Sequence, residues 1–456
     1  METPSDKADV SFVRPTEPTL QPGVRKHEVF GWAMYDFANS GYTTVVITAV
    51  FSAYFVGSVA AGQAWATLAW TLALSLSYAL VMLTMPLWGA WCDRHAAKKR
   101  LLAFTTLGCV LSTAALMVVR PGDVLLGMLL IVVSNTFFAY GESLIAAFLP
   151  ELARPSAMGR VSGWGWSFGY VGGMLCLGLC LAYVLQAQQR SEPASDFVPV
   201  TMGMTAVYYG LASLFTFALL RERAIPQPAS SESMTPTLAW KRLRGSLSSL
   251  SDYPELARLL VCIVAYQAGV AVAITLAAIY AEQVMGFQPQ ETMVLIFALN
   301  IAAAVGALVL GHAQDRWGHQ RTLALTLVGW VLTCLIAALA QSKTAFWGAA
   351  VLAGLCLGSS QSSGRAMAGM LIPVAKSAEF FGLWGFAVRL ASIIGPLLYG
   401  VITWVTVGNQ RLAIGSTGLL FVLGLWLLGP LDMARGRARA EEADRGLATP
   451  SHPVAT

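Results

Sequence analysis

The stretch Gly89-Ala-Trp-Cys-Asp93-Arg94 ends one long apolar run of the sequence, and Gly311-His-Ala-Gln-Asp315-Arg316 ends another. Glycine, aspartate and arginine occupy matching positions in the two stretches. The offset is 222 residues (from 89 to 311), close to half of the 456-residue chain. Two halves with the same order of helices are typical of a transporter built from parallel repeats. The two stretches therefore predict a duplicated membrane protein.

A second pair of positions supports the duplication. Leu149-Pro150 and Ile372-Pro373 each end an apolar run, at an offset of 223 residues (from 149 to 372). An aspartate at a helix end can accept hydrogen bonds from unpaired N–H groups of a neighbouring helix. We therefore expect the matching residues of the first two stretches to form gate loops on the cytoplasmic side: Gly89, Asp93, Arg94, Gly311, Asp315 and Arg316.

The composition also indicates a membrane protein. Hydrophobic residues make up 56% of the chain and charged residues 12%, whereas soluble proteins are roughly 25% charged. A membrane-spanning helix needs about 20 mostly apolar residues, and the apolar runs are too long for strands of an outer-membrane barrel. We expect an all-α integral membrane protein with twelve transmembrane helices in two pseudo-symmetric six-helix halves. The runs lie near residues 29–58, 66–91, 101–119, 124–149, 161–186, 201–220, 258–282, 291–312, 322–340, 345–371, 379–406 and 412–431.

The distribution of Lys and Arg predicts the orientation. With both termini inside, 23 of the 29 basic residues fall in cytoplasmic segments, as the positive-inside rule requires. Nucleic-acid binding is not indicated, because the basic residues are scattered between spans; the lipid bilayer is the expected partner, and we expect a monomer. The expected organisation is a flexible cytoplasmic tail (1–28), a first bundle (29–220), a cytoplasmic linker (221–257), a second bundle (258–431) and a cytoplasmic tail (432–456).

Charged residues inside the spans are functional candidates, because an ionised group in a membrane is costly. The 223-residue offset aligns Glu142 with Arg365, at equal depth on opposite sides of a central cavity. One hypothesis is that these two side chains approach each other when the cytoplasmic side closes. The alternative is that each pairs within its own half or faces a wet vestibule.

The first span carries another charge on a polar face. Asp36, Ser40, Thr44 and Thr48 recur every four residues and share one side of a helix, with Asn39 beside them. Asp36 could titrate and couple transport to protons, or it could be a permanently ionised partner of an arginine. The second, structural or gating role is the favoured one.

Arg389 lies near the middle of the eleventh span. A guanidinium forks onto carboxylates, so Arg389 is a candidate for binding an anionic substrate group. The alternative is a fixed counter-ion for Asp36 or Glu142.

Signals for other kinds of protein are weak. The seven cysteines lie in or beside apolar runs without a CxxC pair, and the five histidines lie in tails, in loops or at span ends without partners. An embedded enzyme would need a nucleophile with a base, or a metal cluster, and a sensor would need an output domain. We therefore expect no enzyme, no metal and no cofactor.

Several strings resemble known families. The stretch ending in Asp93-Arg94, followed by Lys98, Lys99 and Arg100, is similar to the loop signature of the major facilitator superfamily. The remaining strings resemble the vacuole-effluxer family, whose fungal members are autophagy-related amino-acid exporters and which has many bacterial relatives. They are Trp32-Ala-Met-Tyr-Asp36-Phe-Ala-Asn39-Ser40, Arg160-Val-Ser-Gly163, Gly169-Tyr-Val-Gly-Gly173, Gln361 with Ser363 and Arg365, Ile372-Pro373, Glu379-Phe-Phe-Gly382 and Gly395-Pro396.

The resemblance implies a secondary active transporter that moves a small solute by alternating access across a bacterial cytoplasmic (inner) membrane. Efflux of amino acids or related metabolites is the leading expectation; proton-coupled export or import of drugs, peptides or other metabolites is the alternative. Span seven differs from the family, since it reads Tyr266-Gln267-Ala268-Gly269 where an Asn-Asp-Gly often follows the tyrosine. The residues expected to line the substrate cavity or to serve coupling are Tyr35, Asp36, Asn39, Asn135, Glu142, Gln267, Gln361, Arg365 and Arg389.

Overall fold

The computed structural model describes residues 19–60, 65–224, 226, 245, 248–287, 289–407 and 409–448. Most of the predicted N-terminal tail and the central part of the predicted linker lie outside these ranges. The first half contains α1 (Lys26–Tyr42), α2 (Phe51–Tyr54), α3 (Ala66–His95), α4 (Lys98–Ala115), α5 (Val124–Ala146), α6 (Leu149–Leu152), α7 (Met158–Gln189) and α8 (Ala194–Leu219). The second half contains α10 (Pro254–Gln283), α11 (Pro289–Trp317), α12 (His319–Leu339), α13 (Lys343–Leu371), α14 (Ser377–Val405) and α15 (Gln410–Leu428), followed by α16 (Met433–Ala448).

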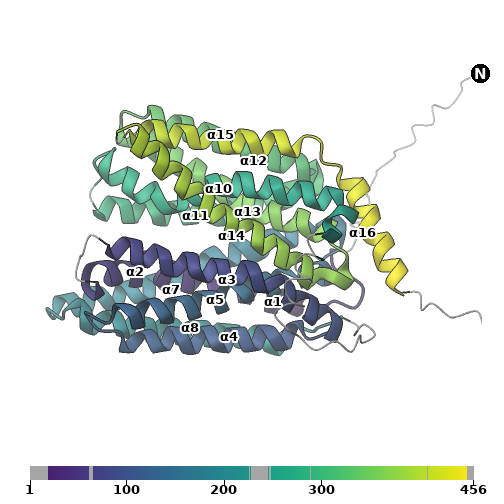
Figure 1. Ribbon diagram of the computed structural model, residues 1–456, viewed down its shortest axis with the longest axis horizontal. Coiled ribbons are helices and arrows are strands. Elements are labelled where there is room, and N and C mark those ends of the chain that lie inside the picture. The colour runs from purple at the N-terminus through teal and green to yellow at the C-terminus, as the bar shows by residue number, and fades with distance from the viewer. Residues whose placement is uncertain are drawn as a thin grey trace, which may run out of the picture.

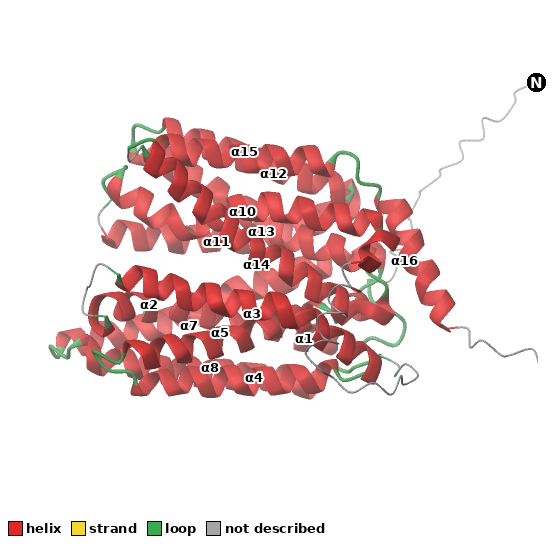
Figure 2. Ribbon diagram, in the orientation of Figure 1, coloured by secondary structure: helices red, strands yellow, loops and turns green. Residues whose placement is uncertain are grey.

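The long helices form two layers that lie side by side (Figure 1). The helices up to α8 make one layer and α10 to α15 make the other, and Figure 2 shows that helix is the main structure throughout the described part. We call the end of the bundle at which α16 lies the basal end, and the opposite end the distal end. This arrangement confirms the all-helical membrane fold that the apolar runs predict. The largest difference in a helix end is at α8, which begins at Ala194 rather than 201.

Eleven of the described helical segments are long and apolar enough to span a membrane. The remaining helix of similar length, α13, is not among them, because its sequence includes Ser359, Ser360, Ser362, Ser363 and Arg365. All five of these side chains are buried. Helix α13 packs against α7, α11 and α12, and this packing gives its polar groups protein neighbours in place of lipid.

The first span departs from regular α-helix in its distal part. Two π-helical turns, Thr43–Ala49 and Phe55–Val59, flank α2. The hydroxyl of Thr48 donates to the carbonyl of Thr43, five residues back, at 3.0 Å. Wide turns of this kind are often found at functional sites.

Small residues let helices of the first half approach closely. A Cβ placed on Gly169 of α7 would lie 2.9 Å from Ser40 Oγ, and one on Gly173 would lie 2.7 Å from Thr44 Oγ1. Ser40 and Thr44 of the polar face therefore pack against the glycine face of α7, whereas Thr48 of the same face is exposed. Such faces are common between membrane helices.

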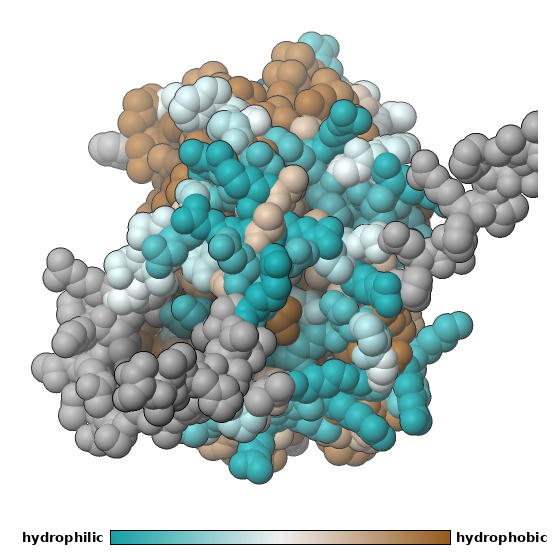
Figure 3. All heavy atoms as spheres, turned by 90° about the vertical axis from the view of Figure 1, so that its right-hand side faces the viewer, coloured by the Kyte–Doolittle hydropathy of each residue, from teal (hydrophilic) through white to brown (hydrophobic). Residues whose placement is uncertain are grey.

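The outer surface of the bundle is apolar. Large exposed side chains include Leu107, Leu211, Leu332 and Leu419, on four different helices. Figure 3 shows the basal end, where hydrophilic residues gather in the centre and hydrophobic ones at the sides. This distribution suits a protein whose sides face lipid and whose ends face water.

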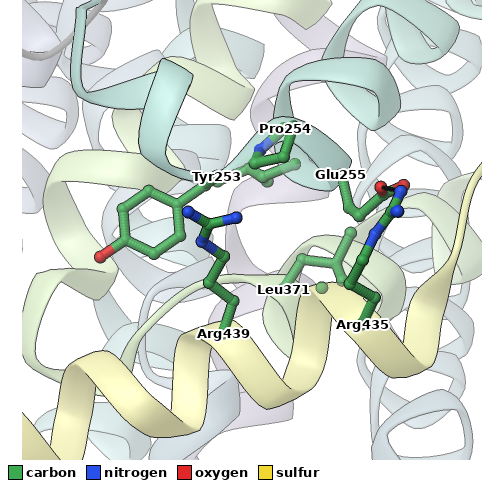
Figure 4. Close-up of a pocket in the computed structure, with 8 residues that line it drawn as sticks. Tyr253, Pro254, Glu255, Leu371, Arg435 and Arg439 are labelled. Atoms are coloured by element: carbon green, nitrogen blue, oxygen red, sulfur yellow. Dashed lines mark hydrogen bonds and ion pairs between the residues drawn. The ribbon is translucent and has the colours of Figure 1, made fainter.

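Residues 433–448, which the sequence places in a tail, form the helix α16. The carboxylate of Glu255 at the start of α10 accepts from the backbone N–H of Asp432 at 2.9 Å and binds Arg435. Figure 4 shows Arg435 and Arg439 reaching from α16 toward the residues around Glu255. Near the other end of α16, Asp444 accepts from the N–H groups of Val374 (2.9 Å) and Ala375 (3.1 Å). Helix α16 is thus fastened across the basal end of the second half.

Candidate functional site: the contacts between the two halves

Two aspartates from the repeated stretches hold the basal ends of the halves together. Asp93, near the end of α3, accepts from the N–H groups of Ala378 (3.1 Å) and Glu379 (2.9 Å) at the start of α14. The unpaired N–H groups and positive dipole end of a helix favour a carboxylate here, by about 0.3–2 kcal/mol. The aspartate of one half therefore caps a helix of the other half.

Asp315 repeats this contact in the opposite direction. From the end of α11 it accepts from the N–H groups of Gly159 and Arg160, both at 3.0 Å, at the start of α7. The side chain of Arg160 adds an ion pair, with its Nε 3.5 Å from Asp315. Helix pairs α3–α14 and α7–α11 are thus joined by two equivalent contacts, as expected for a duplicated fold.

The two motif glycines permit these contacts. A Cβ on Gly89 would collide with the backbone of Ala378 and would lie 2.8 Å from the Cα of Glu379. A Cβ on Gly311 would lie 3.0 Å from the Cα of Gly163. The helices therefore cross where neither side needs room for a side chain.

The structure brings the two motif arginines into no such contact. Arg316 is exposed and Arg94 is half-buried, and neither has a side-chain hydrogen bond or ion pair among the described contacts. The aspartates and glycines of the predicted gate loops lie between the halves, whereas these arginines lie at the basal surface.

Lys98 is a component that the charge count misses. The count assigns Lys98 to a cytoplasmic loop, but its side chain is completely buried. Its ammonium group pairs with Glu151, donates to Ser377 Oγ at 2.8 Å and lies 4.0 Å from Asp93. The lysine therefore links the first half to the N-terminus of α14 beside the Asp93 contact. Its neighbours Lys99 and Arg100 are also basic, so the run of positive charge indicated a hydrated loop and gave no signal of this burial.

Arg365 forms an ion pair across the halves with Asp36, with Nη1 2.6 Å from Oδ2. Its other nitrogens donate to Ser162, from Nε to the hydroxyl at 3.2 Å and from Nη2 to the carbonyl at 2.9 Å. The rings of Trp32 and Trp166 lie 4.7 and 5.2 Å from the guanidinium carbon. Arg365 is therefore held on every side by α1 and α7. Trp32 and Ser162 lie within strings that resemble the effluxer family, and Trp166 lies between two of them, but the sequence carried no signal of this role for any of the three.

The second ion pair joins Arg389 of α14 to Glu142 of α5. Arg389 also lies over the ring of Tyr78, 5.3 Å from its centroid. The hypothesis that Glu142 and Arg365 pair directly is therefore wrong for this conformation. Equal depth in the two halves did not decide which acid each arginine reaches, because Asp36 lies closer to Arg365 and Arg389 is available to Glu142. In this conformation Arg389 is the counter-ion of Glu142, which is one of the two roles expected for it from the sequence.

Four other predicted residues make their hydrogen bonds within their own half. The hydroxyl of Tyr35 hydrogen-bonds with Thr106 (3.0 Å) and Tyr209 (3.1 Å), inside the first half. Buried Asn135 donates to Ser77 Oγ at 2.5 Å. The remaining two pair with each other, since Gln267 Nε2 donates to Gln361 Oε1 at 2.6 Å.

Asn39 is buried, and its side chain has no hydrogen bond among the described contacts.

Basic residues that flank the spans are held by acids. The hydrogen bond that Arg223 donates to Glu28 raises the pKa of Arg223, and the one that Arg435 donates to Glu255 raises the pKa of Arg435. Both arginines therefore stay charged at the basal end. The described residues contain no group of three or more His, Cys, Asp or Glu side chains that could hold a metal ion.

Comparisons with known proteins agree with this architecture. The family model described as "Vacuole effluxer Atg22 like" matches residues 66–159 and 156–441. A Bacillus subtilis (strain 168) protein named as an uncharacterized MFS-type transporter, YxiO, is 29% identical over 404 residues, which are 87% of this chain and 93% of that protein. Autophagy-related protein 22 of Cryptococcus neoformans var. neoformans serotype D (strain JEC21) is 24% identical over 303 residues, 62% of this chain. Those residues are 52% of the fungal protein, so the match spans about half of its length.

Solved structures share the fold. The human organic anion transporter MFSD10 aligns over 90% of this chain and 100% of its own, with a TM-score of 0.70 and 16% identity. The transporter FucP in the outward conformation aligns over 88% of this chain and 97% of its own, with a TM-score of 0.66 and 14% identity. The family model covers most of the chain, and the relatives and structural neighbours are transporters rather than enzymes. This protein therefore belongs to the Atg22-like vacuole effluxer family and is a multi-pass membrane transporter of the MFS type.

Proposed function

We propose that this protein is a secondary active transporter that exports amino acids or related metabolites by alternating access. The observation that carries the proposal is the reciprocal pair of contacts at the basal end, Asp93 on the start of α14 and Asp315 on the start of α7. Hydrogen bonds of this kind can be exchanged for water without unfolding either half. The halves can then rock about a central site, as parallel-repeat transporters do.

The basal end is proposed to be cytoplasmic, in a bacterial cytoplasmic membrane, with a monomer as the transporting unit. The excess of Lys and Arg in the segments assigned to this side supports the orientation. The Bacillus relative supports a bacterial membrane. The cargo proposal rests on the resemblance to fungal amino-acid exporters.

The ion pair with Arg365 supports a structural role for Asp36, in which it helps to hold the two halves together, more than it supports proton uptake. We call this the latch role. Arg365 lies 2.6 Å from the Asp36 carboxylate, and this ion pair joins the two halves. Replacement of Asp36 by Asn should therefore change the balance between conformations and leave the response to a proton gradient as it is in the parent protein. Transport by the parent that is driven by a proton gradient and loses this response in Asp36→Asn would assign coupling to Asp36.

Transport can be tested in proteoliposomes loaded with radiolabelled amino acids, dipeptides or drugs. The expected result is saturable flux of amino acids, absent from protein-free liposomes. A variant at the outer surface, Leu125→Ala, should keep the flux of the parent protein, because this leucine lies on the same helix as Glu142 but is 79% exposed. Flux of drugs or peptides without flux of amino acids would contradict the proposed cargo, and no flux of any solute would contradict the transport function.

A further inference from the structure

The two ion pairs between the halves differ in how completely their arginines are bound. Arg365 has an acid, a hydroxyl, a carbonyl and two aromatic rings around it. Arg389 has Glu142 as its hydrogen-bond partner, and its buried Nε has no partner among the described residues. A guanidinium has five N–H donors. Arg389 therefore keeps unused donors, and Arg365 is largely satisfied.

The pairs also differ in exposure. The side chains of Arg365 and Asp36 are 3% and 9% exposed, whereas those of Arg389 and Glu142 are 10% and 22% exposed. Glu142 is thus the most accessible of the four groups. A molecule that enters between the halves can reach this pair more easily than the Arg365 pair.

Substrate chemistry follows from charge balance. Asp36 and Glu142 each lie ten residues from the basal end of their span, at Lys26 and Leu152. A substrate ammonium at this depth needs a carboxylate, and that of Asp36 is committed to Arg365. A zwitterion placed between Arg389 and Glu142 would give each protein charge a new partner, so that neither is left unpaired in the membrane interior.

We propose that the Arg389–Glu142 pair is a substrate subsite for zwitterionic solutes. Arg389 binds the substrate carboxylate with its guanidinium fork, and Glu142 binds the α-ammonium, so the substrate replaces a protein ion pair. The Arg365–Asp36 pair does not bind the substrate; it opens when the basal end admits the cargo and closes again behind it, so it holds the halves together in the closed conformation. This assignment rests on the proposed function and adds the residues that bind the charged groups of the cargo.

Equilibrium binding to the purified full-length protein in lipid nanodiscs tests the subsite. The probes are L-leucine, L-tyrosine and L-lysine, each beside its amide, which lacks the carboxylate, and its deamino acid, which lacks the α-ammonium. The parent protein is expected to bind at least one amino acid about 10- to 100-fold more tightly than either analogue, since a buried charged group is left unpaired otherwise. Arg389→Gln should lose the preference over the amide, and Glu142→Gln the preference over the deamino acid.

The double variant Arg389→Gln/Glu142→Gln removes both charges and leaves no unpaired charge in the membrane interior, so it is expected to fold even if a single variant does not. It should lose both preferences while keeping the thermal stability of the parent to within a few degrees. Leu125→Ala should keep both preferences. If the parent binds amino acids and the variants retain its discrimination, the subsite is wrong and the proposed function stands. If the parent binds none of the amino acids, the proposed cargo fails together with the subsite.

Discussion

Tyr35 and Tyr266 each direct their hydroxyl at a glycine of a neighbouring helix, but only the Tyr35 hydroxyl is hydrogen-bonded. A Cβ on Gly141 would collide with the Tyr35 oxygen, and one on Gly364 would collide with that of Tyr266. Tyr266 is completely buried, and its hydroxyl has no partner among the described residues. The two halves therefore share a packing arrangement that is hydrogen-bonded in one and unsatisfied in the other.

This asymmetry predicts opposite responses to loss of a hydroxyl. Tyr35→Phe removes hydrogen bonds to Thr106 and Tyr209 and should destabilise the protein by about 1–2 kcal/mol. Tyr266→Phe removes an unsatisfied buried group and should be neutral or stabilising. Thermal unfolding of both variants in the same detergent checks the order. An equal loss of stability in both would show that Tyr266 has a hydrogen-bond partner.

The identity of the ion pairs predicts which mutations are coupled. Asp36→Asn leaves the buried charge of Arg365 without its acidic partner, which should lower the free energy of unfolding by about 3–5 kcal/mol. Adding Arg365→Gln should recover part of that loss, so the two mutations will be non-additive. A matched cycle with Glu142→Gln and Arg365→Gln should be closer to additive, because these two residues belong to different pairs. Thermal unfolding of both sets measures the two coupling energies, and a larger value for Glu142 would reverse the pairing.

The reciprocal aspartate contacts predict how the basal end opens. Asp93→Asn weakens the bond to α14 and leaves the buried Lys98 with less negative charge. Asp315→Asn affects Arg160, which is partly exposed and can be hydrated, so Asp93→Asn should favour opening more than Asp315→Asn does. Spin labels on cysteines introduced at the exposed positions Arg100 and Arg321 would report a longer distance between the halves. The seven native cysteines are buried and free, so they should react slowly. Glu441→Gln on exposed α16 is the control, and equal distances in all variants would contradict the gate role.

Gly165 predicts a steric test of the latch. A Cβ at this position would lie 2.5 Å from both Arg365 Nη2 and Asp36 Oδ2. Gly165→Ala should therefore push the pair apart and destabilise the closed basal end by about 1–3 kcal/mol. Gly178→Ala lies on the same helix with no atom within 4 Å, and it should be neutral or stabilising because alanine favours helix. The melting temperature should fall in Gly165→Ala and should stay the same or rise in Gly178→Ala.

The attachment of α16 predicts local loosening when it is removed. Asp444 binds the N–H groups of Val374 and Ala375 between α13 and α14. In Asp444→Asn, or in a chain ending at Leu431, hydrogen exchange at residues 372–376 should become faster. Arg437→Gln, which affects an exposed pair within α16, should leave this exchange unchanged. Unchanged exchange in the truncated chain would show that α16 does not support this connection.

The sequence predicted the features that repeat in the two halves. It missed those that depend on how each helix is rotated about its own axis. Apolar length predicted the spans, and the matched stretches identified Asp93 and Asp315, which lie between the halves and whose gate role stays a prediction. The offset placed Glu142 and Arg365 at equal depth, but depth does not specify which way a side chain points around its helix. Lys98 was assigned by its charge to a cytoplasmic loop, although Asp93, five residues before it, and Glu151, 53 residues after it, lie around its ammonium group in the interior. Such pairs become visible only when the helices are packed.

The two neutral ion pairs have an electrical consequence. A charge that crosses the full membrane potential gains or loses about 2.3 kcal/mol per 100 mV. Because the acid and the base of each pair lie at the same depth and their charges sum to zero, rocking of the halves carries almost no net protein charge across the field. Voltage should therefore act on the transport cycle mainly through the charge of the cargo, and the empty protein should reorient at a rate that hardly depends on membrane potential.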